Sequence, residues 1–131
     1  MMPWHFIVVQ DREMIKKMAD ANGKAGNALA SAPLAILVCM DMSKALENAP
    51  NYAIIDCALA EENMVLAALS LGIGSCYFGT WPQDYKIEGQ RKLFNLAEHL
   101  IPHMILSFGY PKNNLYKDEY KEIDLKDVEF Y

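Results

Sequence analysis

Residues 54–79 read IIDCALAEENMVLAALSLGIGSCYFG, and this stretch carries the longest helix that the sequence predicts. Pro50 opens the helix and Gly72 ends it, so we expect it to run from about Asn51 to Leu71. The helix is apolar nearly all round. Three of its polar residues recur every seven positions and so form one narrow seam: Asp56, Asn63 and Ser70.

Two adjacent carboxylates, Glu61 and Glu62, lie in the middle of this helix. Neighbouring residues on a helix point about 100° apart, which suits a solvated edge better than shared acid/base work. We therefore predict a structural position for both on the solvated edge of the helix.

Outward from this helix, the sequence predicts a sheet. The apolar run Leu34–Met40 follows Pro33 and has the length of a strand, which predicts a central strand buried on both faces. Three further strands are expected at Trp4–Val9, Ser75–Phe78 and His103–Phe108.

Shorter helices are expected between these strands. Asp11 is a suitable N-cap for a helix that ends at Asn22-Gly23, and a second short helix is expected over about Glu88–Asn95. The stretch GKAGNALASA is ambiguous, because its glycines favour a loop and its alanines a helix; we predict a loop with a helical turn. The alternation of strands and helices indicates a sheet covered by helices.

Composition limits the possible functions. The chain has 131 residues, of which 53% are hydrophobic, and this fits one domain over residues 1–131. A net charge of −5 argues against nucleic-acid binding, which needs a basic face. The charged residues within 52–71 argue against a membrane span, and the N-terminus does not resemble a signal peptide, so we expect a cytoplasmic protein.

Side chains that commonly carry catalysis are scattered. We expect Cys39, Cys57 and Cys76 to be reduced and mostly buried, and the dispersed histidines to form no metal site. There is no GxSxG, no GxGxxG and no phosphate-binding GKS or GKT loop, so no nucleophile is evident. The glycines of LGIGSCYFGTWP (71–82) mark either a helix stop and a bulge, which they favour by themselves, or a backbone wall against a planar cofactor.

Four segments together resemble the nitroreductase family over nearly the whole chain. They are PWHFIVV at 3–9, APLAILVC at 32–39, the quoted stretch at 54–79, and HMILSFGYPK at 103–112. The resemblance implies an α+β fold with a mainly antiparallel sheet flanked by helices. It also implies a homodimer that binds FMN at the subunit interface, with residues 112–131 as an arm exchanged between subunits. The long apolar helix fits this assembly, since a second chain would cover it.

The resemblance further implies flavin-borne chemistry with no catalytic side chain. FMN would accept a hydride from NADH or NADPH and pass reducing equivalents to a nitroaromatic or quinone-like acceptor. The backbone around residues 78–80 would face the flavin ring, while Cys76 and Tyr77 would belong to the strand core. The implied cofactor-binding residues are Pro3, Trp4, Asn27, Phe78, Gly79, Thr80, Lys117 and Lys121.

Some of these assignments have alternatives. Lys117 and Lys121 either meet the FMN phosphate or belong to a solvated charged arm. Trp81 and Tyr85 are candidates for a substrate pocket or for dimer contacts.

The chain also departs from the family pattern. The family's N-terminal phosphate-binding motif is absent from this sequence, and Met2 stands where a glutamine is expected. A dimer that binds FMN weakly or not at all, without catalysis, is therefore the alternative function, and a flavin carrier of the same fold is a third.

Overall fold

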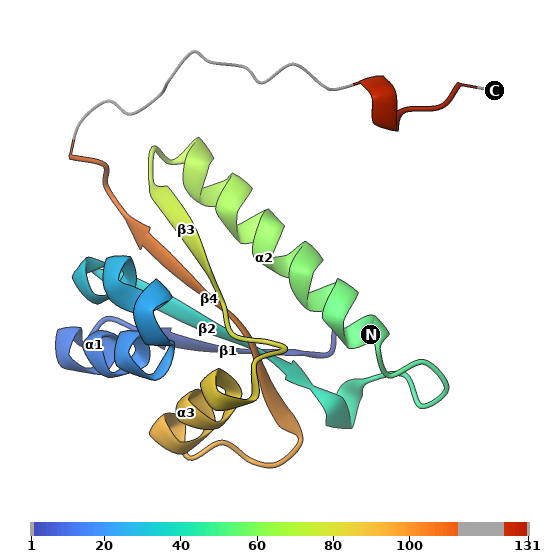
Figure 1. Cartoon of the computed structure of the whole chain (residues 1–131), viewed down its shortest axis with the longest axis horizontal. Coiled ribbons are helices and arrows are strands. Elements are labelled where there is room, and N and C mark those ends of the chain that lie inside the picture. Colours follow the sequence, from blue (N-terminus) through green and yellow to red (C-terminus); the bar gives the residue numbers. More distant parts are fainter. Residues whose placement is uncertain (1, 113–124, 131) are drawn as a thin grey trace.

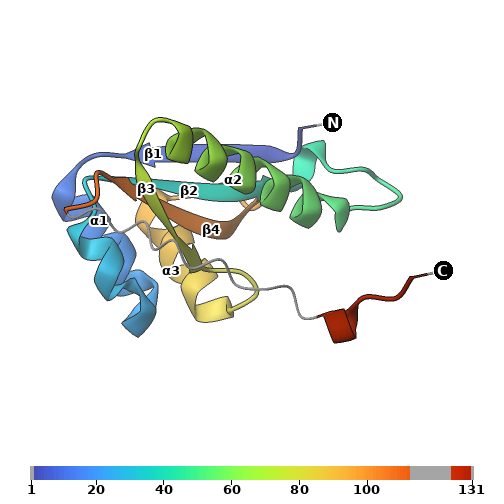
Figure 2. The same cartoon turned by 90° about the horizontal axis from the view of Figure 1, so that it is seen from above.

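The chain folds into a four-stranded antiparallel sheet with helices on both faces (Figures 1 and 2). The structure is a computed structural model that describes residues 2–112 and 125–130. The strands are β1 (Trp4–Val9), β2 (Leu34–Asp41), β3 (Gly74–Gly79) and β4 (Leu100–Gly109), in the spatial order β1-β2-β4-β3. The predicted α+β class is confirmed.

Two layers of helices enclose the sheet, as Figure 2 shows edge-on. One face packs against α1 (Arg12–Ala21), the 3₁₀ helix η1 (Gly23–Ser31) and α3 (Asp84–Phe94). The other packs against the long helix α2 (Tyr52–Ser70). Two short 3₁₀ turns complete the described elements: η2 (Met42–Lys44) and η3 (Leu125–Asp127).

Local signals in the sequence place most of these boundaries correctly. The Asp11 carboxylate accepts a 2.7 Å hydrogen bond from the Met14 amide and caps α1. Gly72 follows α2 with a φ of 72°, a left-handed conformation that glycine adopts without strain. The central position of β2 is confirmed, since Leu37, Val38 and Cys39 are all fully buried.

Three elements differ from the prediction. The ambiguous stretch forms mostly 3₁₀ helix, η1, rather than loop. Helix α3 begins at Asp84 instead of Glu88, directly after Gln83 in extended conformation. Strand β4 begins at Leu100 instead of His103, although Pro102 cannot donate to a ladder. The register explains this: Met104 pairs with Val38 and Pro102 pairs with Cys39, so His103 is an extra, bulged residue.

The cysteines agree with the prediction in two of three cases. Cys39 and Cys57 are buried, and burial raises the pKa of each thiol to about 12. Cys76 is exposed, contrary to the prediction, and it lies on β3, an edge strand of the sheet.

Within residues 2–112 and 125–130, none of the helices has the length and apolar character needed to cross a membrane.

Candidate functional site

The end of β3 leaves its backbone accessible at Gly79. Gly79 is exposed, and a Cβ placed on it would meet no atom within 4 Å. The next residue, Thr80, is fully buried. Because Gly79 has no side chain, a flat group can approach the main chain closely at this residue.

Buried polar side chains hold the Gly79 carbonyl from the α1 and α3 side. The Lys86 ammonium donates to it at 2.9 Å, and the Asn22 amide donates at 3.4 Å. The Thr80 hydroxyl in turn donates to the Asn22 side-chain oxygen at 3.2 Å. Asn22 and Thr80 are fully buried and Lys86 is 5% exposed, so this arrangement is rigid and shielded from water.

Close packing of two helices makes this arrangement possible. Asn22 is the C-cap of α1, and Lys86 lies in the first turn of α3. A Cβ on Gly89 would lie 3.1 Å from the Ala21 side chain, so glycine at 89 lets α3 approach the end of α1 closely. The long Lys86 side chain therefore reaches the β3 backbone from between the two helices.

The bulged residue His103 holds the same segment through its carbonyl. This oxygen accepts hydrogen bonds from the Trp81 amide at 2.9 Å and from the Thr80 amide at 3.3 Å. The Thr80 bond is long for an amide donor, so of the two amides this one is held more weakly. The Trp81 and His103 rings lie with their centroids 6.2 Å apart.

The His103 side chain forms a buried ionisable pair with α2. Its Nδ1 lies 2.7 Å from Oε1 of Glu61, and the two side chains are 6% and 2% exposed. The prediction that Glu61 lies on a solvated edge is wrong. The bulge in β4 turns the imidazole toward α2, where it gives the carboxylate a buried partner.

The neighbouring carboxylate behaves as predicted, whereas the strand residues opposite it do not. Glu62 is exposed and accepts a 2.7 Å hydrogen bond from the Tyr77 hydroxyl. Partial burial and this bond to Glu62 raise the pKa of Tyr77 to about 12. Tyr77 is 41% exposed and Cys76 is exposed too, so the expectation that both belong to the strand core is wrong.

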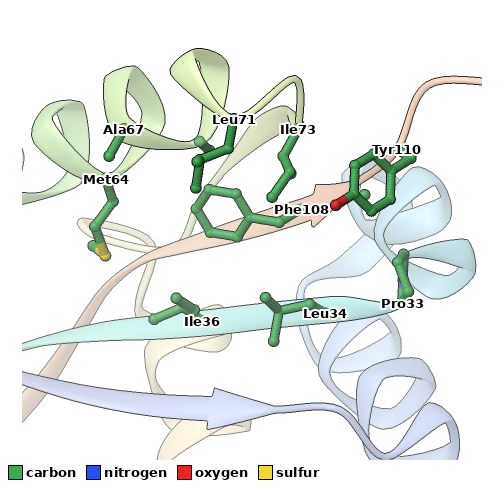
Figure 3. A pocket seen from close by; sticks show the side chains of 11 residues that line it. Pro33, Leu34, Ile36, Met64, Ala67, Leu71, Ile73, Phe108 and Tyr110 are labelled. Carbon is green, nitrogen blue, oxygen red and sulfur yellow. The ribbon is translucent and has the colours of Figure 1, made fainter.

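An apolar pocket of about 470 Å³ lies elsewhere, between the C-terminal half of α2 and the ends of β2 and β4 (Figure 3). Its walls include Leu34, Met64, Leu71 and Phe108, and the Tyr110 hydroxyl is the polar group that Figure 3 shows there. Such a lining offers little to the polar edge or phosphate of a nucleotide. The end of β3, with its fixed backbone polar groups, is therefore the candidate site.

A comparison with known families identifies the fold. The model of the nitroreductase family matches residues 21–110, which include β2, α2, β3, α3 and β4. The chain belongs to the nitroreductase family.

Individual members of this family are similar over most of the chain. "Putative NADH dehydrogenase/NAD(P)H nitroreductase" of Methanothermobacter thermautotrophicus is 44% identical over 112 residues, covering 86% of this chain and 57% of that protein. The structure of an FMN-dependent nitroreductase from Clostridium difficile superposes with a TM-score of 0.86 at 28% identity, covering 99% of this chain and 76% of that one. "FMN reductase (NADPH)" of Bacillus subtilis is 34% identical over 74 residues, covering 55% of this chain and 29% of that protein.

This nitroreductase-family chain spans little more than half the length of its archaeal relative.

The structure separates the nitroreductase site residues predicted from the resemblance. Gly79 and Thr80 lie together at the end of β3, but the Phe78 side chain points into the core and is 5% exposed. Asn27 is exposed on η1. Lys117 and Lys121 lie outside the described residues.

Pro3 and Trp4 lie far from Gly79 and Thr80. They stand at the start of β1, the edge strand opposite β3, so three strand spacings, roughly 14 Å, separate the two edges. Pro3 is also fully buried. One chain therefore does not bring Pro3 and Trp4 together with Gly79 and Thr80.

Sequence reasoning missed two of the residues that fix the site in this nitroreductase-family member, Lys86 and His103. Lys86 lies just before the predicted short helix and looks like an ordinary solvated lysine. Asn22 is predicted as a helix stop, and the resemblance places it in the loop that passes near the flavin. His103 looks like the first residue of a strand, because the bulge that turns it depends on the pairing of β2 with β4. The one available signal was Pro102, since a proline beside a central strand often marks a bulge.

Proposed function

We propose that this protein is an FMN-dependent oxidoreductase that passes reducing equivalents from NADH or NADPH to a nitroaromatic or quinone-like acceptor. The observation that carries the proposal is the exposed backbone at Gly79, whose carbonyl is fixed by Lys86 and Asn22. The names of its relatives support it, since they include an FMN-dependent nitroreductase and an NADPH-dependent FMN reductase.

The described residues fit a flavin at this place. The open space over Gly79 accepts a planar ring, and the Gly79–Thr80 peptide that would lie against it is fixed by hydrogen bonds from Lys86 and Asn22 to its oxygen. When bound, FMN supplies the hydride chemistry, as flavins do in general. The chain's own residues would orient the ring: the open face of Gly79 admits it, and the fixed Gly79–Thr80 peptide forms the surface against which it lies. Lys117 and Lys121 remain the predicted phosphate ligands.

The first prediction concerns cofactor retention. We expect the purified chain, mixed with excess FMN and then freed of unbound ligand, to keep the visible absorption bands of flavin. Anaerobic addition of NADH or NADPH should bleach these bands, and a nitroaromatic or quinone should restore them. A folded protein that stays colourless would overturn the proposal and would favour the alternative of a dimer without FMN or catalysis.

We propose further that two copies form the working unit, with the arm over residues 112–131 exchanged between them. Helix α2 presents a stripe of apolar side chains at helical spacing, each more than half exposed: Tyr52, Ile55, Leu59, Leu66 and Leu69. The distance between the two edges of the sheet also supports a dimer. In a two-fold assembly, a second copy would bring its Pro3 and Trp4 toward Gly79 and Thr80 of the first.

The second prediction tests this stripe. We expect Leu59→Glu to weaken self-association about hundredfold, because the pairing would bury an uncompensated charge. Sedimentation equilibrium measures the effect. Leu46→Glu is the matched control, since Leu46 is 38% exposed in the loop before α2 and lies outside the stripe. A monomeric wild type, or equal effects of the two substitutions, would contradict the proposed dimer face.

A further inference from the structure

Lys86 is a buried cation whose position the proposed reaction does not by itself require. Its side chain is 5% exposed, and its ammonium donates to the Gly79 carbonyl at 2.9 Å. No salt bridge joins Lys86 to a carboxylate among residues 2–112 and 125–130. The Tyr85 ring, with its centroid 5.9 Å from the ammonium, lies on one side of it. Burying a charge is costly, so a charge kept here calls for a reason.

The peptide that Lys86 holds is the one against which the proposed flavin would lie. Asn22 and Lys86 both donate to the oxygen of the Gly79–Thr80 peptide. The N–H of this peptide belongs to Thr80, and its bond to the His103 carbonyl is long, at 3.3 Å. Hydrogen bonds to a carbonyl polarise the whole peptide and make its N–H a stronger donor. The Gly79–Thr80 peptide is therefore both fixed and polarised.

Charge explains why a lysine, and not a neutral donor, would serve here. Hydride addition brings two electrons and one proton, so a reduced flavin carries one more negative charge than the oxidised ring. A cation one hydrogen bond away from the contacting peptide stabilises that added charge. A neutral side chain could hold the carbonyl but could not supply this preference.

We propose that Lys86, together with Asn22, is a positioning residue that makes the site favour reduced over oxidised flavin. Lys86 acts through the Gly79–Thr80 peptide. This inference rests on the proposed function, because it requires FMN over Gly79.

The third prediction measures this preference. We expect Lys86→Met to reduce the ratio of affinities for reduced and oxidised FMN about tenfold, which equals a shift of about 30 mV to more negative potential for a two-electron couple. Fluorescence titration gives the affinity for oxidised FMN, and equilibration with a reference dye gives the potential of the bound flavin. Neither measurement depends on turnover.

Three further variants separate charge from structure. Lys86→Arg keeps the charge and should restore the ratio, whereas Lys86→Gln, which is polar and uncharged, should not. If Lys86→Met fails to fold, Lys86→Gln provides the uncharged variant for the same comparison. Lys92→Met is the matched control, because Lys92 is an exposed lysine on the same helix, and it should leave the ratio unchanged.

The outcomes distinguish this inference from the proposed function. A wild-type chain that binds no FMN overturns both. A wild-type chain that binds FMN, with the same ratio in Lys86→Met or Lys86→Gln, overturns the role of Lys86 alone. Equal loss of affinity for both redox forms, also without a change in ratio, would show that Lys86 merely supports the loop and would likewise overturn the proposal.

Discussion

Replacement of Glu61 by leucine should lower the free energy of unfolding by about 2–3 kcal/mol, the upper part of the range for a buried polar group that loses its hydrogen-bond partner. The Glu61 carboxylate lies 2.7 Å from Nδ1 of His103 in a region that water scarcely reaches. Leucine would fill much of the volume but would leave the imidazole buried beside an apolar side chain. Denaturant unfolding at neutral pH and one fixed protein concentration measures the loss.

Two controls decide whether the pair itself is responsible. Glu62→Leu changes the adjacent carboxylate, whose exposed hydrogen bond to Tyr77 should contribute at most about 1 kcal/mol. The double variant Glu61→Leu/His103→Leu removes both polar groups and should recover more than half of the loss, since apolar replacements of buried pairs are often well tolerated. If Glu61→Leu costs no more than Glu62→Leu, the buried pair does not stabilise the link between α2 and β4.

This pair also shows why the fold was easier to predict than the site. Each predicted strand rests on signals a few residues long, such as the apolar run of β2 or the cap at Asp11. Whether Glu61 is buried with a partner or exposed depends on His103, a residue 42 positions away in β4. The helical geometry that placed Glu61 and Glu62 about 100° apart was sound, but it could not say which of them would meet His103.

The candidate site, too, was predictable from the sequence only in part. The glycines in the segment 71–82 by themselves favoured a helix stop and a bulge, with a backbone wall against a planar group as the alternative, and the structure leaves Gly79 open. The resemblance supplied the identity of that group as an expectation. The buried contacts of Asn22 and Lys86 could not be predicted, because they require the ends of α1, β3 and α3 to converge. Secondary-structure propensity and hydrophobic periodicity describe single helices or strands, so they do not show which ends of different elements come together in the fold.

The final prediction concerns the open backbone itself. We expect Gly79→Val to weaken FMN binding at least about hundredfold, equivalent to roughly 2.7 kcal/mol, while leaving the fold intact. Gly79 is not among the glycines with positive φ, and its added Cβ would meet no protein atom within 4 Å. Valine also favours strands. The protein therefore tolerates the side chain, whereas a ring in contact with the backbone does not, since both would occupy the same space.

A matched substitution on the same strand tests this separation of binding from folding. Ser75 is exposed and lies four residues earlier in β3, roughly 13 Å away, on the same side of the strand as Gly79. Ser75→Val should leave both the affinity for FMN and the unfolding midpoint near their wild-type values. FMN binding by Gly79→Val within about threefold of wild type would mean that the flavin does not lie over Gly79. The hydrogen bonds of Lys86 and Asn22 to the Gly79–Thr80 peptide would then contribute only to the stability of the fold, since no flavin ring would lie close to this peptide.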